Sequence, residues 1–232
     1  YAPGVVTVGG RIQSGVIGPG CTNERYDDCR ELAQFCIDST LPLLIDAGAL
    51  DLVRGLIDYA DTRSRSLSRT ILTPHHGEAA RLLTQLGSPH SRADVDADPA
   101  ASAKELASLT GAIILLKSAT TVCSYLKHDQ GSRTQEIVSI PQETPWAGVA
   151  GSGDVLAGTV AGIAAGFQAR AERRQGNPSI SEAECATLAS LGAWVHAQAA
   201  LRASVGSEGE ARPIQAIDIA RALPVIIGEL CS

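Results

Sequence analysis

A short run of small and acidic residues has the chemistry to bind a phosphate group and to activate a hydroxyl that attacks it: Gly151, Ser152, Gly153 and Asp154. An apolar helical pattern begins directly after it, so the run stands at a predicted helix N-terminus. Backbone N–H groups there lack intrahelical partners and the helix dipole is positive, which favours an anion. A bound phosphate would repel the Asp154 carboxylate, so its position there needs a functional reason. One such reason is that Asp154 takes a proton from a hydroxyl that attacks the phosphate. The alternative interpretation of the run is a small-residue turn capped by Asp154.

The pattern of the remaining chain predicts the elements that hold this run. Apolar runs at residues 15–17, 42–45, 70–72 and 111–116 alternate with helical patterns, which is typical of parallel β-α units. Two alternating stretches, residues 122–126 and 136–140, predict an antiparallel hairpin at the sheet edge. The predicted fold class is α/β, a central mostly parallel sheet with helices on both faces and an antiparallel edge hairpin.

Helical periodicity predicts the covering layers of the sheet. Helices are expected over residues 23–39, 50–59, 101–109 and 182–203, with a last short helix over residues 217–223. Residues 87–100 are rich in Pro, Asp and Ser and are expected to form a surface loop. The helix after residue 154 is expected to bury one face, because its large apolar residues recur at spacings of four, three and four: Leu156, Val160, Ile163 and Phe167.

Polar residues follow several of the predicted strands, where parallel sheets bind ligands. Gly20 and Asp46 follow the first two strands, and His75 follows the third. A histidine in such a loop is as plausibly reactive as structural. Lys117 follows the fourth strand together with hydroxyl residues, a combination that suits nucleotide phosphates or ribose; the other interpretation is an exposed lysine before a turn.

Composition limits the class of protein. The 232 residues carry 19 Lys and Arg against 25 Asp and Glu, a net charge of −6, which disfavours nucleic-acid and anionic-membrane partners. No apolar run approaches the roughly 18 residues of a membrane span, and no secretory signal is recognised. The six cysteines form no C-x-x-C pair, so reduced thiols and a cytoplasmic location are expected. The length predicts a single domain over residues 1–232.

Five motifs occur in an order that is specific beyond this general pattern: Gly18-Pro19-Gly20, Ile45-Asp46-Ala47-Gly48-Ala49-Leu50, Thr73-Pro74-His75-His76-Gly77-Glu78, Leu116-Lys117-Ser118-Ala119-Thr120-Thr121 and Ala150-Gly151-Ser152-Gly153-Asp154-Val155-Leu156-Ala157-Gly158. This set resembles the ADP/ATP-dependent NAD(P)H-hydrate dehydratases of the ribokinase-like superfamily. The resemblance runs from about residue 15 to residue 224. The last motif alone indicates the superfamily, and the third and fourth narrow it to the dehydratases.

The resemblance implies a repair reaction in which a nucleotide, ADP in typical bacterial members, drives removal of water from hydrated NADH or NADPH. AMP and phosphate are then released. It implies that Asp154 is the general base and that Gly20, His75 and Asp154 contact the hydrated cofactor. It places the nucleotide on eight residues: Lys117, Ser118, Ala119, Thr120, Thr121, Gly151, Ser152 and Gly153. Mg²⁺ would accompany the nucleotide without a dedicated set of side-chain ligands, and a homo-oligomer, typically a tetramer, is expected.

The chain departs from the family pattern in three places. Family members normally begin with a further strand, a glycine-rich turn and a helix, and this ribokinase-like domain is expected to lack them. Gly48 stands where many members have Asp, and Ala150 where many have Gly. Two other functions share the same motifs. One is a kinase for a small alcohol such as a vitamin precursor, and the other is a nucleotide-binding protein without catalysis.

Overall fold

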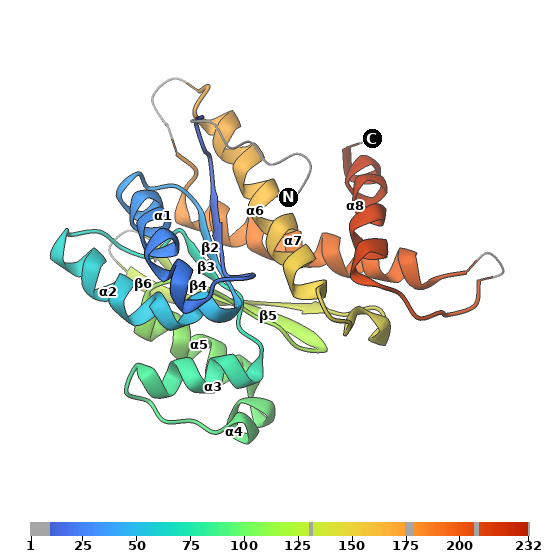
Figure 1. Ribbon diagram of the computed structural model, residues 1–232, viewed down its shortest axis with the longest axis horizontal. Helices are drawn as coiled ribbons and strands as arrows, with labels where there is room; N and C mark the ends of the chain where they lie inside the picture. The colour runs from blue at the N-terminus through green and yellow to red at the C-terminus, as the bar shows by residue number, and fades with distance from the viewer. Residues whose placement is uncertain (1–9, 130–131, 175–178, 207–208, 232) are drawn as a thin grey trace.

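Six strands form one sheet in the computed structural model, which describes residues 10–129, 132–174, 179–206 and 209–231 (Figure 1). The strands lie side by side in chain order: β1 (Gly15–Ile17), β2 (Leu43–Ile45), β3 (Thr70–Leu72), β4 (Ile113–Leu116), β5 (Thr120–Asp129) and β6 (Ser132–Pro141). β1 to β4 pair in parallel, whereas β5 and β6 are antiparallel to their neighbours. The predicted mostly parallel sheet with an edge hairpin is confirmed.

Helices cover both faces of this sheet (Figure 1). One layer is formed by α1 (Tyr26–Asp38), α2 (Val53–Thr62), α3 (His76–Gln85) and α5 (Pro99–Thr110), with the short α4 (Arg92–Ala97) beside α3. The other is formed by α6 (Ser152–Ala171) and α7 (Glu182–Ser204), and α8 (Ala216–Cys231) packs on these two helices. Three 3₁₀ turns complete the described elements: η1 (Asn23–Arg25), η2 (Ala47–Leu52) and η3 (Pro145–Ala147).

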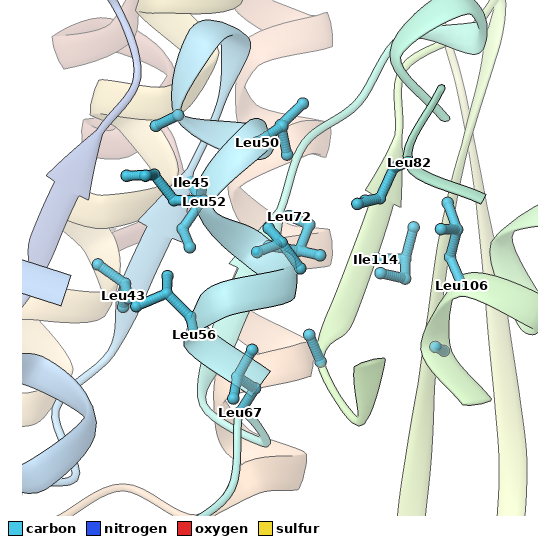
Figure 2. Packing of buried hydrophobic residues seen from close by; sticks show 14 of the residues in the cluster. Leu43, Ile45, Leu50, Leu52, Leu56, Leu67, Leu72, Leu82, Leu106 and Ile114 are labelled. Carbon is cyan, nitrogen blue, oxygen red and sulfur yellow. The ribbon is translucent and has the colours of Figure 1, made fainter. Parts of the chain in front are cut away.

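β2, β3 and β4 are buried on both faces because alternate residues point to opposite layers. In β2, Leu43 and Ile45 join the core under α1 to α5, while Leu44 joins the core under α6 and α7. Ile113 and Ile114 divide in the same way in β4. Figure 2 shows the first of these cores, with strand residues meeting leucines of η2, α2, α3 and α5. The sheet is therefore the shared wall of two cores.

Three local predictions are wrong. Residues 87–100 contain α4, whose N-terminus is fixed by a capping box in which Ser91 accepts from the Asp94 amide and Asp94 accepts from the Ser91 amide. The last helix continues eight residues beyond 223 despite Pro224. Phe167 is also 48% exposed, although Leu156 and Val160 of the same predicted face are buried. The buried face of α6 instead continues through the smaller or polar residues Ala164, Gln168 and Ala171.

The described part of the chain holds no helix with the length and apolar character needed to cross a membrane. The apolar run at residues 5–8 lies outside the described residues.

Candidate active site

The N-terminus of α6 opens at the carboxyl-end edge of the sheet. Gly151 precedes the helix with φ of +83°, a left-handed conformation that glycine adopts without steric cost. No side chain caps the helix, and its first intrahelical hydrogen bond runs from the Val155 amide to the Gly151 carbonyl. The amides of Gly153 and Asp154 therefore have no intrahelical acceptor. This is the arrangement expected of an anion site, and the capped turn of the alternative interpretation is not formed.

His196 of α7 supports this helix start from inside the protein. Its Nε2 lies 3.1 Å from the carbonyl oxygen of Ser152 and 3.2 Å from Oγ of the same residue. Because a carbonyl only accepts, Nε2 carries a proton and Nδ1 is bare. Burial lowers the pKa of His196 to about 4, so the ring is neutral at pH 7. The start of α6 is thus held by an uncharged hydrogen-bond donor, and no charge from His196 changes the positive potential at the helix N-terminus.

Lys117 stands opposite, at the end of β4, between two carboxylates. Its Nζ lies 2.6 Å from Oδ1 of Asp46, which follows β2, and 3.9 Å from Oε2 of Glu78 in α3. The Asp46 side chain is 3% exposed and that of Lys117 is 22% exposed. A Cβ atom placed on Gly153 would lie 3.6 Å from Nζ of Lys117. The lysine and the first turn of α6 therefore lie close together, and Oδ2 of Asp46 is 3.7 Å from the same Cβ position.

His75 is placed by the start of α3. Its Nδ1 accepts hydrogen bonds from the amides of Gly77 and Glu78, and Glu78 accepts one from the His75 amide. This is a capping box with an imidazole in place of the usual hydroxyl or carboxylate. The side chain is nevertheless 60% exposed. The structural and the reactive interpretations of this histidine are therefore compatible, since Nδ1 caps the helix while most of the ring remains accessible.

These residues surround a cavity of about 770 Å³. It is lined by seven of the residues predicted from the sequence: His75, Lys117, Ser118, Ala119, Thr121, Ser152 and Gly153. Two further lining residues, Gln142 and His196, each have a buried side-chain atom without a hydrogen-bond partner in the described part of the chain, Oε1 and Nδ1 respectively. The cavity thus offers unpaired acceptors beside a cation and a helix N-terminus.

Four other predicted residues lie outside the lining. Thr120 is exposed at the start of β5, and Gly151 precedes the helix. Asp154 is exposed in the first turn of α6, where no described residue pairs with it. Gly20 lies in the turn after β1 and is exposed. In that turn a Cβ on Gly18 would come within 2.3 Å of the Asp46 carbonyl oxygen, so the turn is packed tightly against the strand end that carries Asp46.

Four residues of the site are absent from the set that the motifs assign to ligand binding: Asp46, Glu78, Gln142 and His196. Asp46 and Glu78 stand within the quoted motifs, and both follow strands at the correct edge, which is the signal that points to them. His196 lies in the middle of an alanine-rich helix, and its sequence surroundings carry no such signal.

Among the described residues no group of three or more His, Cys, Asp or Glu side chains is arranged to hold a metal ion. Two carboxylates, Asp46 and Glu78, face Lys117, which lines the cavity. Any divalent ion here would depend on ligand oxygens and water for most of its coordination.

The fold of this chain is similar to that of known ribokinase-like proteins. The structure superimposes on a ribokinase-like superfamily protein from Enterococcus faecalis with a TM-score of 0.55 at 21% identity, covering 94% of this chain and 63% of that one. An ADP/ATP-dependent NAD(P)H-hydrate dehydratase from Bacillus subtilis, co-crystallized with ATP/Mg²⁺, gives a TM-score of 0.63 at 21% identity, covering 94% and 64%. The fold is therefore ribokinase-like. The chain belongs to the NAD(P)H-hydrate dehydratase family, whose sequence profile matches residues 5–220.

Curated relatives agree with this assignment. The bifunctional NAD(P)H-hydrate repair enzyme Nnr of Mycobacterium tuberculosis is 35% identical over 156 residues, which cover 67% of this chain and 29% of that enzyme. The ADP-dependent (S)-NAD(P)H-hydrate dehydratase of Neisseria meningitidis is 35% identical over 161 residues, covering 68% and 44%. The chain thus matches less than half the length of these relatives.

Proposed function

We propose that this chain carries the dehydratase function of its family and restores NADH or NADPH from the hydrated forms in a reaction driven by ADP or ATP. The observation that carries the proposal is the approach of the α6 N-terminus to Lys117, with 3.6 Å between a Cβ built on Gly153 and Nζ. Unpaired helix amides and an ammonium group on two sides of one cavity suit a phosphate chain.

Each side of the cavity has a proposed task. Lys117, Ser118, Ala119, Thr120 and Thr121 are assigned to the nucleotide, together with Gly151, Ser152 and Gly153. The family membership and the lining of the cavity by most of these residues support that assignment. Oε1 of Gln142 is a buried acceptor without a partner among the described residues, and it suits an exocyclic amine of the nucleotide base. Gly20 and His75 are assigned to the hydrated cofactor.

Asp154 is the proposed general base. It takes the proton of the hydroxyl on the hydrated nicotinamide ring while that oxygen attacks the terminal phosphorus of the nucleotide. The phosphorus–oxygen bond to the nucleotide breaks, and ADP leaves as AMP. The carbon–oxygen bond to phosphate then breaks and the neighbouring ring carbon gives its proton to water, which restores the carbon–carbon double bond. Phosphorylation is needed because hydroxide is a poor leaving group. The exposure of Asp154 and its lack of a partner among the described residues support this assignment.

Mg²⁺ is proposed to arrive with the nucleotide, where it would neutralise phosphate charge. Its coordination would come mainly from phosphate and water, because Asp46 and Glu78 are already paired with Lys117. A homo-oligomer stays a prediction from the family resemblance.

The test is to incubate the purified chain with hydrated NADH, ADP and MgCl₂ and to follow the return of reduced-nicotinamide absorbance. We expect recovery that requires ADP and that yields AMP and phosphate in equal amounts. The kinase alternative predicts a stable phosphoester and no absorbance recovery. Because the chain matches only part of its relatives, an inactive result is repeated with a chain extended to their length. No recovery there contradicts the proposed function.

A further inference from the structure

Two cysteine side chains meet beside the turn that follows β1. Sγ of Cys21 lies 2.9 Å from Sγ of Cys29, although the residues belong to different segments. Cys21 is in the turn itself and Cys29 is in the first half of α1. The gap exceeds the disulfide bond length of about 2.05 Å by less than 1 Å. Both residues are half-buried and both are free thiols.

The other four cysteines are placed differently. Cys36, Cys123 and Cys185 are buried, and burial raises the pKa of each thiol to about 11, 11 and 12 respectively. Because these three thiols are buried, an oxidant in solution does not reach them without opening of the core. Cys231 is exposed near the end of α8. Sequence spacing predicts that Cys29 shares a buried face with Cys36. Cys29 does pack against the core that contains Cys36, but it is only half-buried and its Sγ also contacts Cys21.

We infer that Cys21 and Cys29 are a modification site that closes to an intramolecular disulfide when a small-molecule disulfide such as oxidised glutathione is present. One protein thiolate attacks a glutathione sulfur and releases the first glutathione thiol. The second protein thiolate attacks the resulting mixed disulfide and releases the other. Two protons leave the protein thiols, and two electrons pass from the protein to the glutathione disulfide, which is reduced to two thiols.

Closure fixes a turn that belongs to the active-site region. The backbone oxygen of Cys21 lies against Gly48, where a Cβ would approach it to 2.7 Å, and the neighbouring Gly18 is packed on Asp46. The disulfide would tie this turn to α1. Burial, with a further contribution from the Cys29 thiol, raises the pKa of Cys21 to about 11, so closure is slow at neutral pH and requires long incubation.

Peptide mapping tests the inference directly, because trypsin cleaves between the two cysteines at Arg25. Cys21 is recovered in residues 12–25, Cys29 in residues 26–30 and Cys36 in residues 31–54. After incubation with oxidised glutathione, alkylation and digestion, we expect one disulfide-linked product of residues 12–25 and 26–30, and two fewer free thiols per chain. Dithiothreitol is expected to restore both.

Variants control the assignment. Cys21→Ser and Cys29→Ser are each expected to abolish the linked product, whereas Cys231→Ser is expected to leave it unchanged. Linkage of residues 31–54 to either peptide, or glutathione retained on both cysteines without a link, overturns the inference. Circular dichroism of each serine variant checks that the fold is retained.

The link to catalysis rests on the proposed function, in which Gly20 of this turn contacts the hydrated cofactor. A turn held in one conformation costs less to order on binding, so we expect the oxidised chain to show a KM for hydrated NADH lower by twofold or more. An unchanged KM in an active protein removes this link. The peptide map requires no activity, so a failure of the proposed function leaves that test intact.

Discussion

The two sides of the cavity differ in how far the protein itself satisfies their charges. On the Lys117 side, ammonium and carboxylate groups pair with one another and are mostly buried. On the α6 side, the first amides of the helix have no intrahelical acceptor, and Asp154 is exposed without a partner among the described residues. The charges on the Lys117 side therefore contribute to the stability of the fold, whereas the amides and the carboxylate on the α6 side remain available to a ligand. Substitutions on the two sides are expected to separate stability from turnover.

The largest expected effect comes from the α6 side. Asp154→Asn removes the proposed base, and turnover is expected to fall by about 10² to 10⁴ because general-base catalysis contributes that much. Nucleotide binding and the melting temperature are expected to stay unchanged, since Asp154 is exposed. Single-turnover absorbance recovery and calorimetric nucleotide titration provide the measurements. Asp28→Asn, another exposed carboxylate in the first turn of a helix, is the matched control. A fully active Asp154→Asn protein would show that the base is another group.

Lys117→Met tests the opposite side. It leaves the Asp46 carboxylate buried with no cationic partner in the described structure, which is expected to lower the free energy of unfolding by about 3 kcal/mol. Urea unfolding measures the change, and Lys104→Met, an exposed lysine of α5, is the control with no expected loss. If both variants unfold at the same urea concentration, the Asp46–Lys117 pair is not part of the stable framework.

Titration of His196 is expected to make the stability of the fold depend on pH. Its pKa is about 4 in the fold against 6.5 for the unfolded chain, so between these values the unfolded state binds more protons. Stability contributed by the neutral ring is fully present above pH 6.5 and is lost as pH falls toward 4. The 2.5-unit difference corresponds to about 3 kcal/mol at 1.36 kcal/mol per unit. Urea unfolding at pH 7 and pH 4 measures it, and His196→Gln is expected to lose this part of the pH dependence.

A steep acid loss that persists in His196→Gln would assign the effect to carboxylates. Asp94 and Glu184 have pKa values lowered by hydrogen bonds from Ser91 and Ser181 and would contribute in the same direction.

The smallest expected effect lies where the two sides meet. Gly153→Ala adds a methyl group 3.6 Å from Nζ of Lys117. This is an ordinary contact within the protein, but the methyl group obstructs a phosphate bound at the start of α6. Nucleotide affinity is expected to fall about tenfold, equivalent to about 1.4 kcal/mol, while the fold gains up to about 1 kcal/mol from helix propensity. Gly158→Ala, with open space around its Cβ on the same helix, is expected to share the stability gain alone. Equal affinities of the two variants would place the phosphate elsewhere.

Sequence reasoning succeeded where local pattern decides the outcome. The strands are continuous apolar runs such as residues 43–45, and parallel pairing brings their carboxyl ends to one edge, so most strand-end residues were placed correctly. It failed on α8 because Pro224 is a common helix terminator, although the described helix tolerates it. It also missed α4, where the Ser91 and Asp94 capping signal stands in a segment otherwise typical of a loop.

The paired side of the site was the hardest to predict. The hydrogen bond of Lys117 to Asp46 joins residues 71 positions apart, and that of His196 to Ser152 joins residues 44 apart. Neither partner can be chosen without the sheet order and the α6–α7 packing. The unpaired side was predicted because its features follow from consecutive residues 151–154 at a helix start.

The alternation of strand residues between two cores also has a consequence for how the sequence can evolve. A change at Leu44 alters the space under α6 and α7, so a compensating change is expected among residues such as Val160 or Leu188. For a change at the adjacent Ile45, the compensating change is expected in the core under α1 to α5, among residues such as Leu72 or Leu82. Neighbours in the chain therefore belong to separate groups of covarying core residues, which alternate along β2, β3 and β4.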